Sequence, residues 1–246
     1  MIIAVCNQKG GQGKTTTAQA IATGANRIGR KALAIDLDPQ ANLTLSMGSD
    51  SANADTLDFM AGLYTPGQII QHTQQGDIIA SSNRLAAADT VFIGKERSTM
   101  LATALEPLRK QYDVIVIDCP PSLNILLVNA LMAADTVIIP MTADMYSLQG
   151  LYQLKDSIDH AARLNSNLNI GGVLFTRHNT RTIITRDLTD VIREKCAQLK
   201  IPVYQTTISE SVVIREAQTV RTNIYQYSPK SKPAREYMNL LDEIGL

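Results

Sequence analysis

The chain has 246 residues, 45% of them hydrophobic, and its lysines and arginines balance its acidic residues to a formal net charge of zero. That length is enough for one large domain with a well-buried core. The zero net charge excludes a general attraction to nucleic acid, so any such binding needs a local patch. Three scattered cysteines exclude a disulfide framework and a paired-cysteine metal site; Cys6 and Cys119 lie in apolar runs and are expected to be small and buried. No apolar run is long enough to span a bilayer and no signal peptide precedes the first strand, so a cytoplasmic protein is expected.

Strand-like and helix-like patterns then alternate along the chain. Buried strands are predicted at residues 2–5, 31–36, 77–81, 112–118, 135–140, 170–176 and 202–204. Helices are predicted at residues 15–29, 56–61, 96–110, 122–133, 146–164, 181–199, 211–217 and 231–244. Ser122, after Pro120-Pro121, is expected to cap the helix at 122–133. The alternation is typical of an α/β fold with a doubly wound, mostly parallel sheet and helices on both faces. We expect a single domain over residues 1–246, with no helix-turn-helix domain before it.

The first strand is followed by a glycine-rich run and then by a helix-forming run. Glycines let the backbone take positive φ angles and come close to a ligand, and the free N–H groups at a helix start can converge on an anion. Lys14 adds a positive charge, and the hydroxyl of Thr15 can ligate Mg²⁺. The residues expected to hold a nucleotide are Lys9, Gly10, Gly11, Gln12, Gly13, Lys14, Thr15 and Thr16.

The run is a variant of the general phosphate-binding loop. Gln8 stands where the general pattern has its first glycine, and an extra lysine, Lys9, precedes the glycines. The alternative is a glycine turn that only packs, with Lys9 in solvent. Strand, turn, lysine, hydroxyl and helix nevertheless follow one another in the order that a nucleotide site needs, so nucleotide binding is predicted.

Three carboxylates are placed to serve that site, because the carboxyl ends of parallel strands share one edge of the sheet. Asp118 closes an apolar strand, the usual place for a carboxylate that holds Mg²⁺ through water. Asp36 and Asp38 are two apart and share a face where the chain is extended, so one can steady Mg²⁺ or Lys14 while the other orients an attacking water. The alternatives are an ordinary strand-end aspartate for Asp118 and a helix-capping aspartate for Asp38. No second acceptor is evident, so transfer of the phosphoryl group to water is the simplest reaction.

Several motifs carry a resemblance to a known family. Lys9-Gly-Gly-Gln-Gly-Lys-Thr-Thr16 resembles the deviant Walker A loop of the ParA/MinD class of P-loop ATPases. Asp36-Leu-Asp-Pro-Gln-Ala-Asn42 and Tyr112-Asp-Val-Ile-Val-Ile-Asp-Cys-Pro-Pro-Ser-Leu-Asn124 are similar to the Soj-like branch of ParA-type partition ATPases. The segments from Pro140 to Leu151 and from Tyr227 to Ala234 also look like that branch.

The resemblance implies an activity, cofactors and partners. It implies that Lys9 reaches across a homodimer to the partner's ATP, that Lys14 holds phosphate, and that Asp38 positions the lytic water. Thr15, Asp36 and Asp118 would serve Mg²⁺. A Mg-dependent ATPase of this kind, weak until stimulated, binds DNA without sequence preference when dimeric with ATP. A ParB-like centromere-binding partner would stimulate hydrolysis during plasmid or chromosome partition, which places the protein on the nucleoid.

DNA contacts are expected in the C-terminal third. From residue 171 onward, eleven lysines and arginines outnumber eight acidic residues. The alternative is a set of solvated helix faces with internal ion pairs. By resemblance Arg181 contacts DNA, with Arg186 and Arg215 as further candidates. The chain departs from the Soj pattern at Ser209-Glu210-Ser211-Val212-Val213-Ile214, where two arginines are replaced.

Gln12 is a second departure, because the family usually has a small or branched apolar residue there. Its amide could touch phosphate, touch the partner subunit or face solvent. Two other functions would share most of these motifs: a positioning ATPase for a protein cargo, and a MinD-like membrane-associated ATPase. The mixed-to-acidic sequence from Arg235 to Ile244 does not favour the membrane alternative, which calls for a basic amphipathic helix.

Overall fold

An eight-stranded sheet forms the centre of the computed structural model, which describes residues 1–50, 54–94, 96–179 and 182–246. The strands lie in the order β3-β4-β2-β5-β1-β6-β7-β8. Their bounds are β1 Ile2–Val5, β2 Ala32–Asp36, β3 Gln71–Thr73, β4 Gly76–Ile79, β5 Val114–Asp118, β6 Thr136–Met141, β7 Asn169–His178 and β8 Val203–Ser209. Neighbouring strands run parallel, except for the antiparallel hairpin of β3 and β4 at one edge. The predicted doubly wound, mostly parallel sheet is therefore confirmed.

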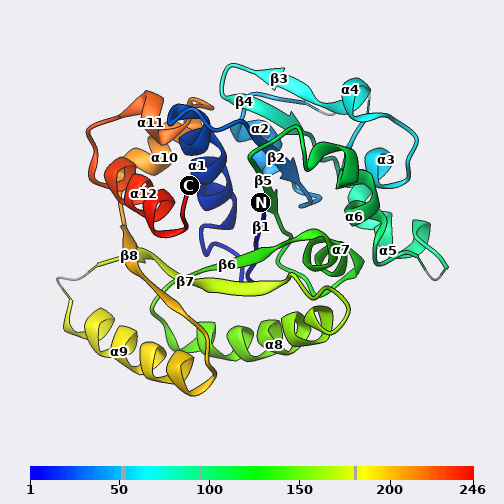
Figure 1. The fold of residues 1–246 in the computed structure, drawn as a ribbon. Helices are drawn as coiled ribbons and strands as arrows, with labels where there is room; N and C mark the ends of the chain where they lie inside the picture. The colour runs from blue at the N-terminus through cyan, green and yellow to red at the C-terminus, as the bar shows by residue number, and fades with distance from the viewer. Residues whose placement is uncertain (51–53, 95, 180–181) are drawn as a thin grey trace.

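Helices cover both faces of the sheet (Figure 1). On one face the core includes side chains of α1 Lys14–Arg27, α2 Asn42–Ser46, α10 Val212–Thr219, α11 Ile224–Tyr227 and α12 Lys232–Glu243. On the other face it includes side chains of α3 Thr56–Met60, α4 Pro66–Ile69, α5 Ala88–Val91, α6 Met100–Leu105, α7 Ile125–Ala133, α8 Met145–Ala162 and α9 Ile183–Gln198. Two 3₁₀ turns, η1 Asn83–Ala87 and η2 Glu106–Leu108, belong to this second face. Within the described ranges, none of the helices combines the length and apolar character that a membrane crossing requires.

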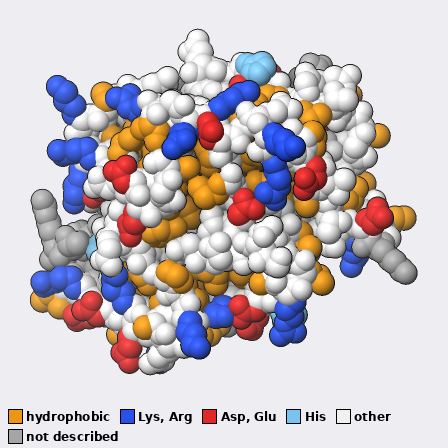
Figure 2. All heavy atoms as spheres, in the orientation of Figure 1, with side chains coloured by type: hydrophobic (Ala, Val, Ile, Leu, Met, Phe, Trp, Pro, Cys, Tyr) orange, Lys and Arg blue, Asp and Glu red, His pale blue; other side chains and the backbone are white. Residues whose placement is uncertain are grey.

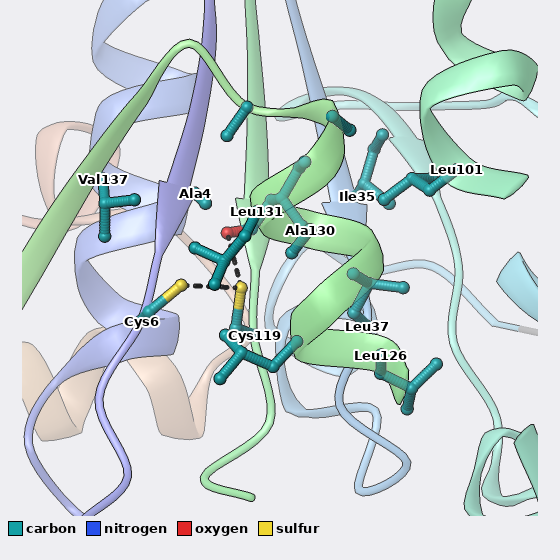
Figure 3. Close-up of a cluster of buried hydrophobic side chains, with 14 of the residues drawn as sticks. Ala4, Cys6, Ile35, Leu37, Leu101, Cys119, Leu126, Ala130, Leu131 and Val137 are labelled. Carbon is teal, nitrogen blue, oxygen red and sulfur yellow. Dashed lines mark hydrogen bonds between the residues drawn. The ribbon is translucent and has the colours of Figure 1, made fainter. Parts of the chain in front are cut away.

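The strands β1, β2 and β5 end together at one edge of the sheet. Val5 and Asp36 both stand opposite Asp118 in the register of these parallel pairs. The side chains beneath this edge are closely packed (Figure 3). Cys6 and Cys119 are fully buried there, as predicted, with their sulfur atoms 3.1 Å apart. The edge is thus a firm base for the loops that follow each strand.

The helix that follows β1 is held by the end of the described chain. In Figure 1 the blue α1 and the red α12 lie side by side. The Thr17 and Tyr237 hydroxyls are 3.2 Å apart. Gly24 permits this close approach, because a Cβ there would lie 2.6 Å from a methyl carbon of Leu241 and 2.7 Å from the hydroxyl of Tyr225.

Some element boundaries differ from the sequence prediction. The helix expected from Ser122 begins instead at Ile125, because the Asn124 side chain accepts from the N–H groups of Leu126 and Leu127. The helix expected over 96–110 is shorter: it covers α6 and then tightens into η2, where Pro107 supplies no N–H. β8 continues to Ser209, five residues past the predicted end at 204, by pairing with β7.

Candidate nucleotide-binding site

The glycine-rich loop joins β1 to α1 in the conformation that its sequence predicts. Gly11 and Gly13 have φ angles of 74° and 83°, in the left-handed region that side chains disfavour. Gly13 is the N-cap of α1, so the helix begins directly at Lys14. The free N–H groups of the first helical turn therefore face the loop, and this arrangement suits an anion.

Lys14 is folded back along the loop. Its side chain is almost buried, and its Nζ atom donates to the backbone carbonyl of Lys9 at 3.3 Å. Thr15 and Thr16 follow on the first turn of α1, both partly exposed. The Thr16 hydroxyl accepts from the Gln218 side-chain amide at 2.8 Å, which links α1 to α10.

A cavity of about 600 Å³ extends from this loop towards the ends of β7 and β8. Its floor is Gly10, Gly11, Gly13, Lys14, Thr15 and Thr16, and its walls include Asp38, Gln40, Pro121, Thr176, Ser209, Glu210, Arg215 and Gln218. The volume is of the size that small-molecule sites have. The α10 wall was not predicted from sequence. Gln218 on α10 lies 202 positions from Thr16, and only the tertiary fold brings the two together.

Asp118 ends β5 beside the loop, behind the residues that line the cavity. It is fully buried, and among the described residues neither of its oxygens has a hydrogen-bond partner. Burial raises the pKa of Asp118 well above its ordinary value and the charge of Asp36 raises it further, whereas the Thr15 hydroxyl and the charge of Lys14 lower it. Thr15 is therefore a near polar neighbour, although its contact with Asp118 lacks hydrogen-bond geometry. An unpartnered buried carboxylate is unfavourable, and a cation beside it would relieve that cost.

Asp36 has a task that sequence reasoning missed: it organises the loop after β2. One of its oxygens accepts from the N–H of Asp38 at 3.0 Å, and the other accepts from the N–H and the hydroxyl of Thr44, both at 2.8 Å. Burial raises the pKa of Asp36 to about 6 against the lowering effect of the Thr44 hydrogen bonds, and the charge of Asp38 adds to the increase. Because both oxygens are engaged and the residue does not line the cavity, a contact between Asp36 and a metal stays a prediction.

Asp38 lines the cavity, as its predicted catalytic role requires. Its carboxylate accepts from the N–H of Gln40 at 3.0 Å, so it stabilises the turn after Pro39. The alternative of a helix cap does not describe this contact, because α2 begins only at Asn42, after Ala41. Its other oxygen accepts no hydrogen bond from the described residues, so that oxygen can reach a ligand.

The residues fit a Mg²⁺ ion of the kind that accompanies a nucleotide. Among the described residues, no three histidine, cysteine or acidic side chains gather into a metal site of their own. Mg²⁺ in nucleotide sites keeps several waters and uses few protein ligands besides phosphate oxygens. The Thr15 hydroxyl and the unpartnered Asp118 carboxylate would hold it, in line with the chemistry of the donor atoms.

Gln12 and Lys9 both turn inward, towards the loop between β6 and α8. Gln12 is buried, and its side-chain oxygen accepts from the N–H of Thr142 at 2.7 Å. Of the three alternatives left open for its amide, exposure to solvent is therefore excluded. The Lys9 ammonium group donates to both carboxylate oxygens of Asp144 at 2.8 Å. Sequence reasoning missed Asp144, which lies 135 positions from Lys9. It falls inside the Pro140–Leu151 segment that resembles the family, but no role was expected for it there.

The structure does not bring the three arginines predicted to contact DNA into one group. Arg181 lies outside the described residues. Arg186 is exposed on α9, whereas Arg215, also exposed, lines the nucleotide cavity. Arg177 pairs with Glu210 at 3.3 Å, so part of the C-terminal positive charge is used internally. In Figure 2 lysine and arginine side chains gather at the upper left edge, near α10 and α11, and elsewhere on this face both signs are mixed.

Together, the left-handed glycines, the paired lysines and the strand-end aspartates define a P-loop protein of the ParA/MinD class. The family model described as "AAA domain" matches residues 1–170. The sporulation initiation inhibitor protein Soj of Bacillus subtilis is 36% identical to this chain, over 99% of the chain and 98% of the relative. The chromosome partitioning protein ParA of Myxococcus xanthus is 34% identical, over 99% and 87%.

The fold comparison agrees with that class. A solved structure named cobyrinic acid a,c-diamide synthase from Mycobacterium smegmatis, with a bound ATP analogue and magnesium, has a TM-score of 0.85 and 30% identity, over 98% of this chain and 92% of the other. The chain described here belongs to the Soj/ParA family of P-loop ATPases.

Proposed function

We propose that this chain binds Mg–ATP in the cavity at the start of α1, forms a homodimer around the nucleotide and hydrolyses it. The observation that carries the proposal is the set of groups at one strand edge: the Gly13–Lys14 helix start, the Thr15 hydroxyl and the unpartnered Asp118 carboxylate. Backbone N–H groups and Lys14 would bind the phosphates. The diphosphate and triphosphate ligands of solved relatives support ATP as the nucleotide.

Hydrolysis requires an oriented water and neutralisation of the charge on the transferred phosphoryl group. Asp38 supplies a carboxylate on the cavity wall, fixed by its bond to Gln40, that can accept a hydrogen bond from the water. Lys14 neutralises phosphate charge from the same subunit. Bound Mg²⁺ would add charge neutralisation at the phosphate oxygens.

The second subunit would supply Lys9. A cation delivered from a partner subunit stabilises charge on the phosphoryl group and can raise turnover by about 10³–10⁵. Large apolar side chains at the start of α8 favour a protein interface there: Met145 and Tyr146 are 59% and 81% exposed. Tyr146 also lies 5.9 Å from the Lys9 ammonium group, so the lysine and the apolar patch belong to one surface.

We further propose that the ATP-bound dimer binds DNA without sequence preference and segregates plasmid or chromosomal DNA with a ParB-like partner. The name of the ParA relative, a chromosome partitioning protein, supports this role. Exposed Arg186 and the basic edge near α10 would contribute contacts to the phosphate backbone. The alternative function is the positioning of a protein cargo. Capture of the native partner would distinguish it from DNA segregation.

The first test replaces the phosphate-binding lysine. Lys14→Ala should reduce the affinity for a fluorescent ATP analogue with Mg²⁺ by 100-fold or more, on the order of 3 kcal/mol, because a nearly buried cation is lost from the anion site. Lys195→Ala, on α9 and away from the cavity, is the matched control and should bind as the unaltered protein does. Equal affinities for the two variants would refute the site.

A further inference from the structure

The ion pair between Lys9 and Asp144 places the lysine inside its own subunit. The Lys9 ammonium group lies 2.8 Å from both oxygens of Asp144, and both side chains are about one-third exposed. Asp144 is also the N-cap of α8, where it accepts from the N–H of Ser147 at 3.0 Å. The carboxylate is thus fixed to the helix before it meets the lysine. A lysine held in this way cannot simultaneously extend away from the subunit.

Gln12 ties the phosphate loop to the segment that carries Asp144. Its side-chain oxygen accepts from the N–H of Thr142, and the hydroxyls of Thr142 and Ser147 lie within 3.0 and 3.3 Å of it. Those two hydroxyls also contact Asp144. Each hydroxyl has one proton, and a charged carboxylate is the stronger acceptor, so the protons go to Asp144 and Gln12 is held by the backbone N–H. The two hydroxyls therefore orient Asp144 towards Lys9, while Gln12 holds the backbone of Thr142 beside them.

Electrostatics support the same arrangement. Partial burial would raise the pKa of Asp144, but hydrogen bonds from Lys9, Thr142 and Ser147 outweigh it and lower the pKa to about 2. Asp144 is therefore ionised throughout the neutral range and attracts Lys9 under all ordinary conditions.

We propose that Asp144, oriented by the hydroxyls of Thr142 and Ser147, is a positioning residue that stores Lys9 within the single subunit, so that Lys9 must be released before two subunits pair. The inference rests on the proposed function in one respect, the assignment of Lys9 to the partner's nucleotide. A partly exposed ion pair of this kind favours the stored position of the lysine over the released one by about three- to fivefold. A two-fold dimer releases two lysines, so the factor applies twice to pairing, about 10- to 25-fold.

The storage is tested without nucleotide and without dimerisation. Asp144→Asn removes the charge but keeps a good N-cap for α8. Acetylation of Lys9 by an amine-reactive reagent, followed by mass spectrometry, should become about three to five times faster in this variant. The matched control is Asp159→Asn, which breaks the 2.6 Å pair with Lys155 on the same helix and should speed labelling of Lys155 alone. Asp144→Glu restores the charge and should slow Lys9 labelling again. An unchanged rate at Lys9 in Asp144→Asn overturns the inference.

The consequence for pairing is measured by sedimentation over a range of protein concentrations, with a non-hydrolysable ATP analogue and Mg²⁺. Asp144→Asn should dimerise at about 10- to 25-fold lower concentration than the unaltered protein. The gain should vanish when Lys9→Ala is added to it. Weaker or equal pairing of Asp144→Asn overturns the storage role. If Lys9→Ala alone pairs as well as the unaltered protein, the in-trans role in the proposed function fails, while the labelling result still reports on storage.

Discussion

Asp36 gives the structure a pH dependence that can be isolated with one substitution. The carboxyl is fully buried, and its pKa is about 6, against an ordinary value of 3.8. The folded chain therefore binds a proton in the range where the unfolded chain has already lost it, so the stability that Asp36 contributes falls as pH rises from 3.8 to about 6. The nucleotide-free protein in EDTA is the right state for the measurement, because a bound cation would stabilise the ionised form.

The size of the effect follows from the shift. Each unit of pKa corresponds to about 1.4 kcal/mol, so the free energy of unfolding loses about 2–3 kcal/mol between pH 4 and pH 7.5 through this one group. Asp36→Asn removes the titration and leaves one acceptor oxygen, as in the protonated carboxyl, and that oxygen can still accept from Thr44. The variant should therefore lie close in stability to the unaltered protein at pH 4 and should exceed it at pH 7.5, because only the unaltered protein loses stability as the buried carboxyl ionises.

Urea unfolding followed by circular dichroism at both pH values supplies the assay. The quantity to compare is the difference in unfolding free energy between the two proteins, because it cancels the titration of other groups, such as His178, whose pKa is lowered mainly by burial. A difference that stays constant between pH 4 and pH 7.5, or that grows in favour of the unaltered protein, refutes the reasoning.

Two further predictions concern chemistry and DNA. Asp38→Asn can still accept from the N–H of Gln40, so the turn should persist; turnover measured by phosphate release should fall about 100-fold or more, while ATP-analogue affinity stays within a few-fold. Undiminished turnover would show that Asp38 only stabilises the turn and takes no part in hydrolysis. Arg186→Glu should weaken ATP-dependent DNA binding at every sequence and lower its salt dependence, as a mobility-shift assay at two salt concentrations would show. Arg163→Glu, at the end of α8, makes the same charge change as a control; an equal loss in both variants would assign the effect to net charge.

Most of the fold and the floor of the site could be predicted from local sequence signals. Alternating buried runs indicated the sheet. The predicted start of the first helix, Thr15, lies one residue from the observed start at Lys14, because glycine conformation and helix start are local properties. The wall formed by α10 was not, since the contact of Gln218 with Thr16 depends on how the chain returns to α1. The same limit hid Asp144: its meeting with Lys9 is set by the order of the strands.

Competition between neighbouring residues accounts for the misplaced boundaries. Ser122 and Asn124 are both good caps, and sequence alone does not say which one lies where the backbone turns. In the structure Asn124 is the N-cap, and its side-chain oxygen accepts from two N–H groups at 3.2 Å. Gln12 was equally open from sequence, because a polar amide in a glycine loop has several available partners.

The contact of α12 with α1 has a consequence for how the protein is made. The helix that carries Lys14 packs on residues that leave the ribosome last among those described, with Tyr237 against Thr17 and Leu241 against Gly24. While translation is under way, the phosphate-binding segment lacks its support, although it was synthesised first. Nucleotide affinity should therefore arise only after α12 has left the ribosome, and nascent chains stalled before residue 231 should be unable to retain ATP.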